Sequence, residues 1–316
     1  MKLCTLINQY ITYRKSLGEK FLTNERRLKA FCKAIDPEIE INKISKNVVD
    51  LFLYGNKETD ITSNWFAKHT TLLGFYKYAR TRGYVEQIPL PRILPKRPQP
   101  FVPYIYSKGE LRQLLEAALC YQENKSFVQP HMIRVILILL YSTGLRGHEA
   151  LSLTLNDINL EQNLITVRNS KFYKSRLIPI GDQLKNILVE YLERRAECKL
   201  SDEPGAPLFV GKNCLPLNHD TFRGIFQRIL KKTGISRDGN LPKPPRLHDF
   251  RHTFAVHHLI SWYQEKKDVQ KLLPILSTYM GHSHLAHTTV YLSMTADLLC
   301  EAGERFEEYA MRGGQS

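Results

Sequence analysis

Six of the sixteen prolines of this 316-residue chain lie within residues 88–103, IPLPRILPKRPQPFVP. Proline fixes φ and has no backbone N–H, so this density excludes a helix interior or a central strand. The segment is predicted to be an extended, semi-rigid linker, and Arg92, Lys96 and Arg97 make it basic. We therefore expect two domains, 1–87 and 104–316, in a chain long enough to form two cores.

Residues 1–87 are predicted to form a helical domain. Apolar residues recur at helical spacing in segments 3–17, 23–35, 45–55 and 63–85. Gly18 follows the first segment and Gly55 ends the third, as expected of residues that stop helices.

The charge of the chain indicates a polyanionic partner. The formal net charge is +14 and the pI is near 9.4. Residues 1–100 hold 18 Lys and Arg against 9 Asp and Glu, whereas the remaining 216 residues hold 27 against 22. An excess in the first third suits a domain that clamps DNA, because Lys and Arg bind its phosphates. A basic protein without a nucleic-acid ligand is the alternative that charge alone leaves open.

Residues 104–316 are predicted to be mainly helical around a small three-stranded antiparallel sheet, which makes the fold class mainly α (α+β). Ser107 and Glu110 form a capping-box pattern that begins a helix, and the apolar run 132–141 indicates a central buried helix. Strands are expected at Ile158, 164–167 and 177–180. Further helices are expected at about 181–197, 221–233, 247–263, 266–276 and 296–309.

The stretch HDFRH at 248–252 poses a choice between a metal and a phosphate. His248 and His252 stand four residues apart, the spacing of the zinc-binding H-E-x-x-H motif. Asp249 replaces the glutamate, however, and the guanidinium of Arg251 would repel a cation but bind a phosphate. The six cysteines are scattered without a C-x-x-C pair, which argues against a cysteine-type zinc site and fits a reducing cytosol. We therefore expect no metal and no cofactor.

Candidate site residues lie in motifs spread along the second domain. In order, these are GLRGHE with Arg146, KFYKSRLIP with Lys171, HDFRH with His248 and Arg251, and YMGHSHLAHTTVY with His282 and Tyr291. Together they resemble the tyrosine recombinases, the phage-integrase family of site-specific DNA recombinases. Gly147 and His148 depart from the usual family residues, and the interval from Arg251 to His282 is longer than usual. The ending LSTYMGH is similar to that of integrases carried by transposons and plasmids.

The resemblance implies a fold and a set of roles. It implies a SAM-like helical core-binding domain at 1–87, the linker 88–103 and a catalytic domain at 104–316. Arg146, Lys171, His248, Arg251 and His282 would activate the phosphodiester, and Tyr291 would be the nucleophile.

The chemistry expected of these residues needs no metal. Arginines stay protonated and neutralise charge on phosphate oxygens. A free phenol has a pKa near 10, so Tyr291 needs help, for which His248 is the candidate. Lys171 would protonate the leaving 5′-oxygen. Lys171 is preferred to Lys174 because it stands five residues before Arg176, the spacing of the family.

The expected function is DNA integration, excision or transposition through a 3′-phosphotyrosyl intermediate. A type IB topoisomerase-like relaxing enzyme and a DNA-binding protein with a degenerate site are the alternatives. The expected partners are double-stranded DNA at a specific recombination site and further protomers of a tetramer, with a second recombinase or a DNA-bending protein as an open addition. The amphipathic segment 296–314 is expected to dock on a neighbouring protomer. No membrane association is expected, and the predicted location is the bacterial cytoplasm, at the nucleoid.

Overall fold

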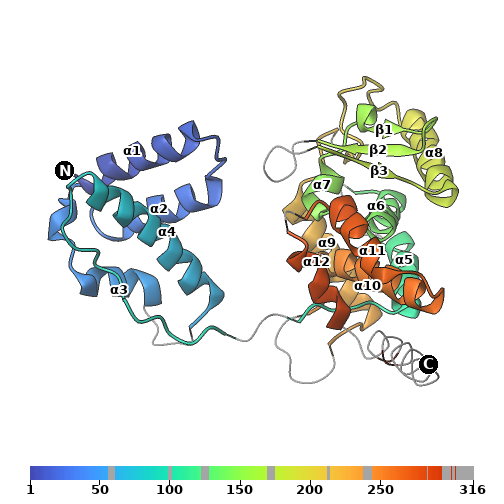
Figure 1. The fold of residues 1–316 in the computed structure, drawn as a ribbon. Coiled ribbons are helices and arrows are strands. Elements are labelled where there is room, and N and C mark those ends of the chain that lie inside the picture. Colours follow the sequence, from blue (N-terminus) through green and yellow to red (C-terminus); the bar gives the residue numbers. More distant parts are fainter. Residues whose placement is uncertain are drawn as a thin grey trace, which may run out of the picture. The chain divides into compact units, whose positions relative to one another are not determined.

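The computed structural model divides into two compact units, Met1–Phe101 and Val102–Ser316, and each is described by itself (Figure 1). The boundary between them falls within the proline-rich segment 88–103. Among the helices that are described, none combines the length and apolar character needed to cross a membrane. The structure describes residues 1–55, 61–98, 102–121, 128–168, 175–211, 214–237, 244–282 and 284–293, together with Cys300 and Gly303.

The first unit is helical, as predicted. Its elements are α1 (Leu3–Ser16), α2 (Leu22–Ala34), the 3-10 turn η1 (Ile41–Lys43), α3 (Lys46–Tyr54) and α4 (Ser63–Thr81). Helix α4 packs against α1, α2 and α3, and buries Trp65 and Phe75 in a core that includes Leu6 and Phe31. The charged residues of these helices are left mainly on the outside, where they can meet solvent or a polyanion.

Helix α4 is shorter than the predicted segment 63–85. The side chain of Thr62 caps its start by accepting a hydrogen bond from the backbone N–H of Trp65 at 3.4 Å. The helix ends at Thr81 because Gly83 adopts a φ of +76°, which cannot continue a right-handed helix.

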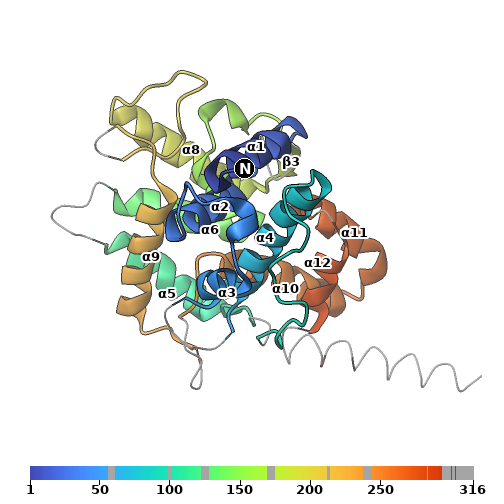
Figure 2. The same cartoon turned by 90° about the vertical axis from the view of Figure 1, so that its left-hand side faces the viewer.

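The second unit surrounds a buried helix. Its elements are α5 (Lys108–Leu119), α6 (Pro130–Thr143), α7 (Gly147–Leu151), η2 (Leu155–Asp157), β1 (Ile158–Asn159), β2 (Leu164–Val167), β3 (Arg176–Pro179), α8 (Asp182–Glu197), α9 (His219–Thr233), α10 (Asp249–Gln264), α11 (Val269–Met280), α12 (Ala286–Thr289) and η4 (Val290–Ser293). Helix α6 contacts α5, α8 and α10, which explains why its sequence is apolar on every side. Helices α5 and α9 run side by side (Figure 2).

The sheet of the second unit is antiparallel, with the order β1-β2-β3. Ile158 pairs with Ile165, and Val167 pairs with Arg176, which opens β3. Strand β3 begins one residue before the predicted 177–180. The predicted fold class, mainly helical with one small antiparallel sheet, is confirmed.

The C-terminal elements differ from the prediction. The helix expected at 266–276 is α11, which runs past Pro274 to Met280. Asp268 caps its start by accepting from the backbone N–H of Lys271 at 3.3 Å, and Gly281, with a φ of +67°, ends it. The short elements α12 and η4 were not predicted. The helix predicted at 296–309 lies outside the described residues, except for Cys300 and Gly303.

Candidate active site

Arg146 lies at the junction between α6 and α7. Helix α6 ends at Gly144, whose φ is +59° and where a Cβ would come 2.6 Å from Cδ1 of Phe254. Arg146 is the N-cap of α7, and Glu149 closes the turn by accepting from the backbone N–H of Arg146 at 3.0 Å. The side chain of Arg146 is 31% exposed, so part of its guanidinium is open to solvent.

Arg251 lies in the first turn of α10 and is only 2% exposed. Its Nη1 donates to the carbonyl of Gly144 at 2.7 Å and its Nη2 to the carbonyl of Met280 at 2.5 Å. Burial lowers the pKa of Arg251 to about 10, and repulsion from the nearby Arg146 adds to this effect. The group therefore remains charged near neutral pH.

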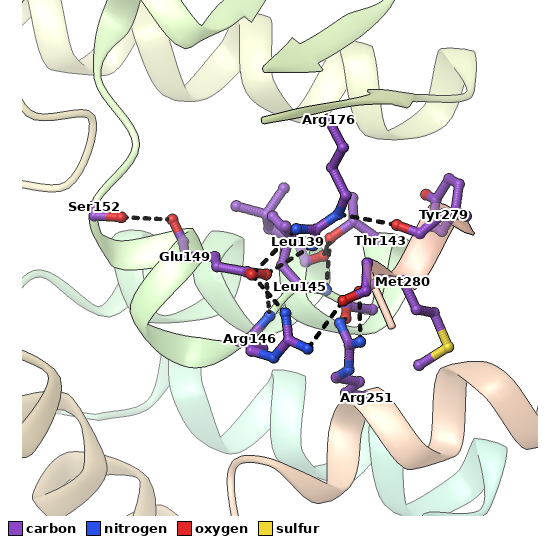
Figure 3. Close-up of polar contacts among 12 residues, drawn as sticks. Leu139, Thr143, Leu145, Arg146, Glu149, Ser152, Arg176, Arg251, Tyr279 and Met280 are labelled. Carbon is purple, nitrogen blue, oxygen red and sulfur yellow. Dashed lines mark hydrogen bonds and ion pairs between the residues drawn. The ribbon is translucent and has the colours of Figure 1, made fainter. Parts of the chain in front are cut away.

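The C-terminal end of α11 gathers three arginines (Figure 3). Arg176 donates from Nε to the carbonyl of residue 279 at 3.0 Å. Arg251 donates to the carbonyl of residue 280, and Arg146 donates from Nη2 to that of residue 281 at 3.3 Å. The last carbonyls of a helix have no partner within the helix and carry partial negative charge, so guanidinium groups stabilise them. His282 follows these carbonyls directly in the chain.

Glu149 holds two of these arginines. It accepts from Nη1 of Arg146 at 2.8 Å, and from Nη1 and Nη2 of Arg176 at 3.1 and 2.7 Å. Burial by itself would raise the pKa of Glu149, but the hydrogen bonds and charge of Arg176, together with Arg146, outweigh it and lower the pKa to about 2. The carboxylate is therefore ionised at neutral pH, and serves as a structural partner for the arginines.

Tyr291 lies in η4 against α10, with 3% of its surface exposed. Its ring stacks on that of His282 with centroids 6.2 Å apart, and lies 5.6 Å from the ring of His252. Burial raises the pKa of the phenol, while the positive charges of Arg251 and Arg146 oppose the rise. The nucleophile predicted from the sequence is thus brought to both predicted arginines.

His282 contacts both Tyr291 and Thr288, which lies in the preceding short helix α12. Nδ1 of His282 lies 2.7 Å from Oγ1 of the buried Thr288, which fixes the orientation of the ring. Burial lowers the pKa of His282 to about 4, followed by repulsion from Arg251 and Arg146. The ring is therefore neutral at pH 7 and can donate or accept a hydrogen bond.

His248 and Lys171 were predicted to complete this site. His248 is exposed just before α10, and its ring makes an edge contact with His252 at 4.9 Å. Although part of the ring is exposed, the protein atoms around the rest of it keep water away, and this lowers the pKa of His248 to about 4. The charges of Arg251 and Arg246 act in the same direction. Water at this exposed position screens part of that repulsion. Lys171 lies outside the described residues.

Three residues of the site were missed as functional candidates in the sequence. Arg176 was used only to judge the spacing of Lys171, yet it donates hydrogen bonds to Glu149. His252 was expected to be a packing residue, and its ring contacts that of Tyr291. Thr288 orients the ring of His282. Arg176 could have been suspected because a charged residue opens an otherwise apolar strand. Within the described part of the chain, no group of three or more His, Cys, Asp and Glu side chains is arranged to hold a metal.

Comparison with known families identifies the chain. Residues 107–297 match the phage integrase family. The chain is a tyrosine recombinase of the phage integrase family. The resemblance seen in the sequence motifs is thereby confirmed.

Relatives match this tyrosine recombinase over most of its length. It is 34% identical over 310 residues to a putative integrase/recombinase of Sinorhizobium fredii, with 95% of this chain and 96% of that protein covered. It is 31% identical to the tyrosine recombinase XerC of Bacillus subtilis, over 73% of this chain and 70% of XerC. It is 33% identical to XerA of Pyrococcus furiosus, over 74% and 71% respectively.

Solved structures share the fold of this tyrosine recombinase. The Tn1549 transposon integrase in complex with a circular intermediate DNA matches with a TM-score of 0.69 and 19% identity, over 97% of this chain and 99% of that one. A lambda integrase dimer bound to a COC′ core site matches with a TM-score of 0.67 and 17% identity, over 93% and 78%. These likenesses concern the fold alone.

Proposed function

We propose that this tyrosine recombinase cuts and rejoins DNA strands at a specific site through a 3′-phosphotyrosyl intermediate on Tyr291. The observation that carries the proposal is the position of its phenol, which is buried where the charges of Arg251 and Arg146 both act on it. A buried tyrosine that served only packing would gain nothing from two positive charges acting on its hydroxyl, and burying a guanidinium such as that of Arg251 is costly.

The charge of the site suits a phosphodiester. Arg146, Arg176 and Arg251 are cationic, while Glu149 is the carboxylate that pairs with them, which leaves an excess of positive charge. The attack on phosphorus places extra negative charge on the non-bridging oxygens, and fixed cations stabilise that charge without reorganisation. The partly exposed Arg146 is the arginine best placed to meet an incoming phosphate.

The reaction follows from these groups. The Tyr291 oxygen attacks phosphorus, the bond from phosphorus to the 5′-oxygen breaks, and the 3′-phosphate becomes linked to the tyrosine. His248, neutral at pH 7, is our candidate to take the phenolic proton; it contacts His252, which contacts Tyr291. Lys171 is our candidate to protonate the leaving oxygen. Attack by the 5′-hydroxyl of another strand reverses the step, so no high-energy cofactor is consumed.

The substrate we propose is double-stranded DNA at a recombination site of a mobile element. The net charge of +14 supports binding to DNA phosphates. The solved relative from the Tn1549 transposon was bound to a circular intermediate DNA. We further propose that the chain acts as a tetramer on DNA, either alone or together with a second recombinase or a DNA-bending protein. The relatives are recombinases and integrases, so a topoisomerase-like relaxing activity is not favoured.

The test is to map covalent protein–DNA junctions. The full-length protein is incubated with DNA fragments that flank its gene, the reaction is stopped with detergent, and protease-resistant peptide–DNA ends are sequenced. We expect adducts on 3′-phosphate ends at discrete positions with the wild-type protein and none with Tyr291→Phe. Tyr263→Phe is the matched control, because it removes a hydroxyl at the far end of α10, near the last residue of that helix.

Two results would contradict the proposal. One is an adduct that persists in Tyr291→Phe but not in a different tyrosine variant, which would move the nucleophile elsewhere. The other is 5′-linked protein, which would require a different reaction geometry. DNA binding by Tyr291→Phe should match that of the wild-type protein, because the phenol contributes no charge to phosphate contacts.

A further inference from the structure

Arg176 occupies a position in the site that differs from that of the other two arginines. All three of its guanidinium nitrogens donate to protein acceptors: Nη1 and Nη2 to the two oxygens of Glu149, and Nε to the carbonyl of Tyr279. Its side chain is 11% exposed, compared with 31% for Arg146. The group is therefore bound to the protein framework, whereas Arg146 remains partly open to a substrate.

The first consequence concerns the charge of Arg146. Both oxygens of Glu149 are shared, since Oε1 accepts from Nη1 of Arg146 and of Arg176, and Oε2 accepts from the Arg146 backbone and from Nη2 of Arg176. Without Arg176, the carboxylate would be left to Arg146 alone and would neutralise it. With Arg176 present, the three groups together keep one positive charge, which a phosphate can use.

The second consequence concerns the position of His282. Gly281 lies against Arg176 so closely that a Cβ would come 3.0 Å from its Nη1, and its φ of +67° also favours glycine. The carbonyl of Gly281 receives Arg146, and His282 is the next residue. The guanidinium of Arg176 thus supports the backbone from which His282 reaches Tyr291.

We infer that Arg176 is a positioning residue for strand cleavage, acting through Glu149 on Arg146 and through the end of α11 on His282. This inference rests on the proposed function, because it concerns the rate of the same cleavage step. Arg176 links β3 to α7 and α11, which come together only in the folded second unit. It need not contact the DNA to control the reaction.

The inference is tested by single-turnover cleavage of a nicked suicide duplex built on a junction mapped with the wild-type protein. We expect Arg176→Met to bind this duplex with wild-type affinity but to cleave it at least about tenfold more slowly, because small displacements of catalytic groups have large effects on rate. Arg176→Lys keeps the charge but not the planar fork, and should cleave at a rate between those of the two proteins.

Adding Glu149→Gln separates positioning from general support of the fold. If Arg176 acts by keeping Glu149 from neutralising Arg146, the double variant Arg176→Met with Glu149→Gln should cleave several-fold faster than Arg176→Met alone. A merely structural role predicts no such gain in the rate per folded molecule, with the folded fraction measured by circular dichroism. The matched control pair is Arg194→Met with Glu190→Gln, an exposed ion pair on α8 that should leave cleavage within about twofold, as expected of surface pairs.

The results distinguish a failure of the proposed function from a failure of the inference about Arg176. A wild-type protein that forms no adduct overturns the proposed function. A wild-type protein that forms the adduct, together with Arg176→Met or Arg176→Lys at the wild-type rate, overturns only the inference about Arg176. A double variant that cleaves no faster than Arg176→Met also overturns it. If Arg176→Met does not fold, Arg176→Lys decides: wild-type cleavage by this variant refutes the inference, and slower cleavage at unchanged affinity supports it.

Discussion

Replacing Glu149 with glutamine tests how strongly the arginine cluster depends on one carboxylate. The pKa of Glu149 is lowered from its ordinary value of 4.5 to about 2. That difference corresponds to about 3 kcal/mol of stability at pH 7, since one pKa unit is worth roughly 1.4 kcal/mol. An independent estimate agrees, because removing one partner of a buried ion pair costs about 3–5 kcal/mol. Both Glu149 and Arg176 are nearly buried, at 9% and 11% exposure, so solvent screens their attraction little.

The lowered pKa of Glu149 determines in which direction its contribution to stability changes with pH. The folded-state pKa lies below the unfolded one, so the contribution of Glu149 is fully present well above pH 4.5 and is lost as the pH falls towards 2. We expect the stability difference between the wild-type protein and Glu149→Gln to decrease from about 3 kcal/mol at pH 7 to about 2 kcal/mol at pH 3.5.

Urea unfolding followed by fluorescence measures this difference in the second unit alone. The chain has two tryptophans, Trp65 in the first unit and Trp262 in the second. A Trp65→Phe background leaves Trp262 on α10 as the reporter, which avoids treating two units as one transition. The matched control is Glu190→Gln, whose exposed pair with Arg194 should contribute less than about 1 kcal/mol. Equal stabilities of the wild-type protein and Glu149→Gln at pH 7, or a gap that does not narrow at pH 3.5, would refute the reasoning.

Two further predictions concern single positions of the site. Gly144→Ala should destabilise the second unit by at least about 1 kcal/mol in the same assay, because its left-handed φ disfavours a side chain and the new Cβ would meet the Phe254 ring at 2.6 Å; an unchanged midpoint would contradict this. The imidazole of His282 should stay neutral in NMR titrations until the pH approaches 4, because burial and Arg251 lower its pKa. The second unit should lose stability as the pH falls from about 6.5 to 4, because the unfolded chain then binds a proton at His282 that the folded protein does not. Titration of His282 near pH 6.5 would contradict this prediction.

Much of the fold could be predicted because its signals are local. Helix starts follow capping residues, as with Ser107 and Glu110, whose reciprocal hydrogen bonds form the capping box of α5. Helix ends follow glycines such as Gly144 and Gly281, which adopt positive φ. Among the boundaries that were wrong, α4 ends before the predicted residue 85 because of Gly83, and α11 continues beyond the predicted residue 276 to Met280, where Gly281 ends it.

The candidate site was predictable in part. The motifs indicated Arg146, Arg251, His282 and Tyr291, and the fold brings these four together. The roles of His248 and Lys171 stay predictions. Spacing along the chain did not indicate which rings would lie beside Tyr291, because those contacts depend on how η4 packs against α10.

The amino-acid sequence by itself was enough to predict most of the helices, a division near the proline-rich segment and the residue types able to act on a phosphate, since each depends on neighbours a few positions apart. Only the tertiary structure decided that Arg146, Arg176 and Arg251 meet on three successive carbonyls at the end of α11. These hydrogen bonds join residues 135, 103 and 29 positions apart. They form only when α7, β3, α10 and α11 come together in the folded second unit, so no local pattern in the sequence could specify them.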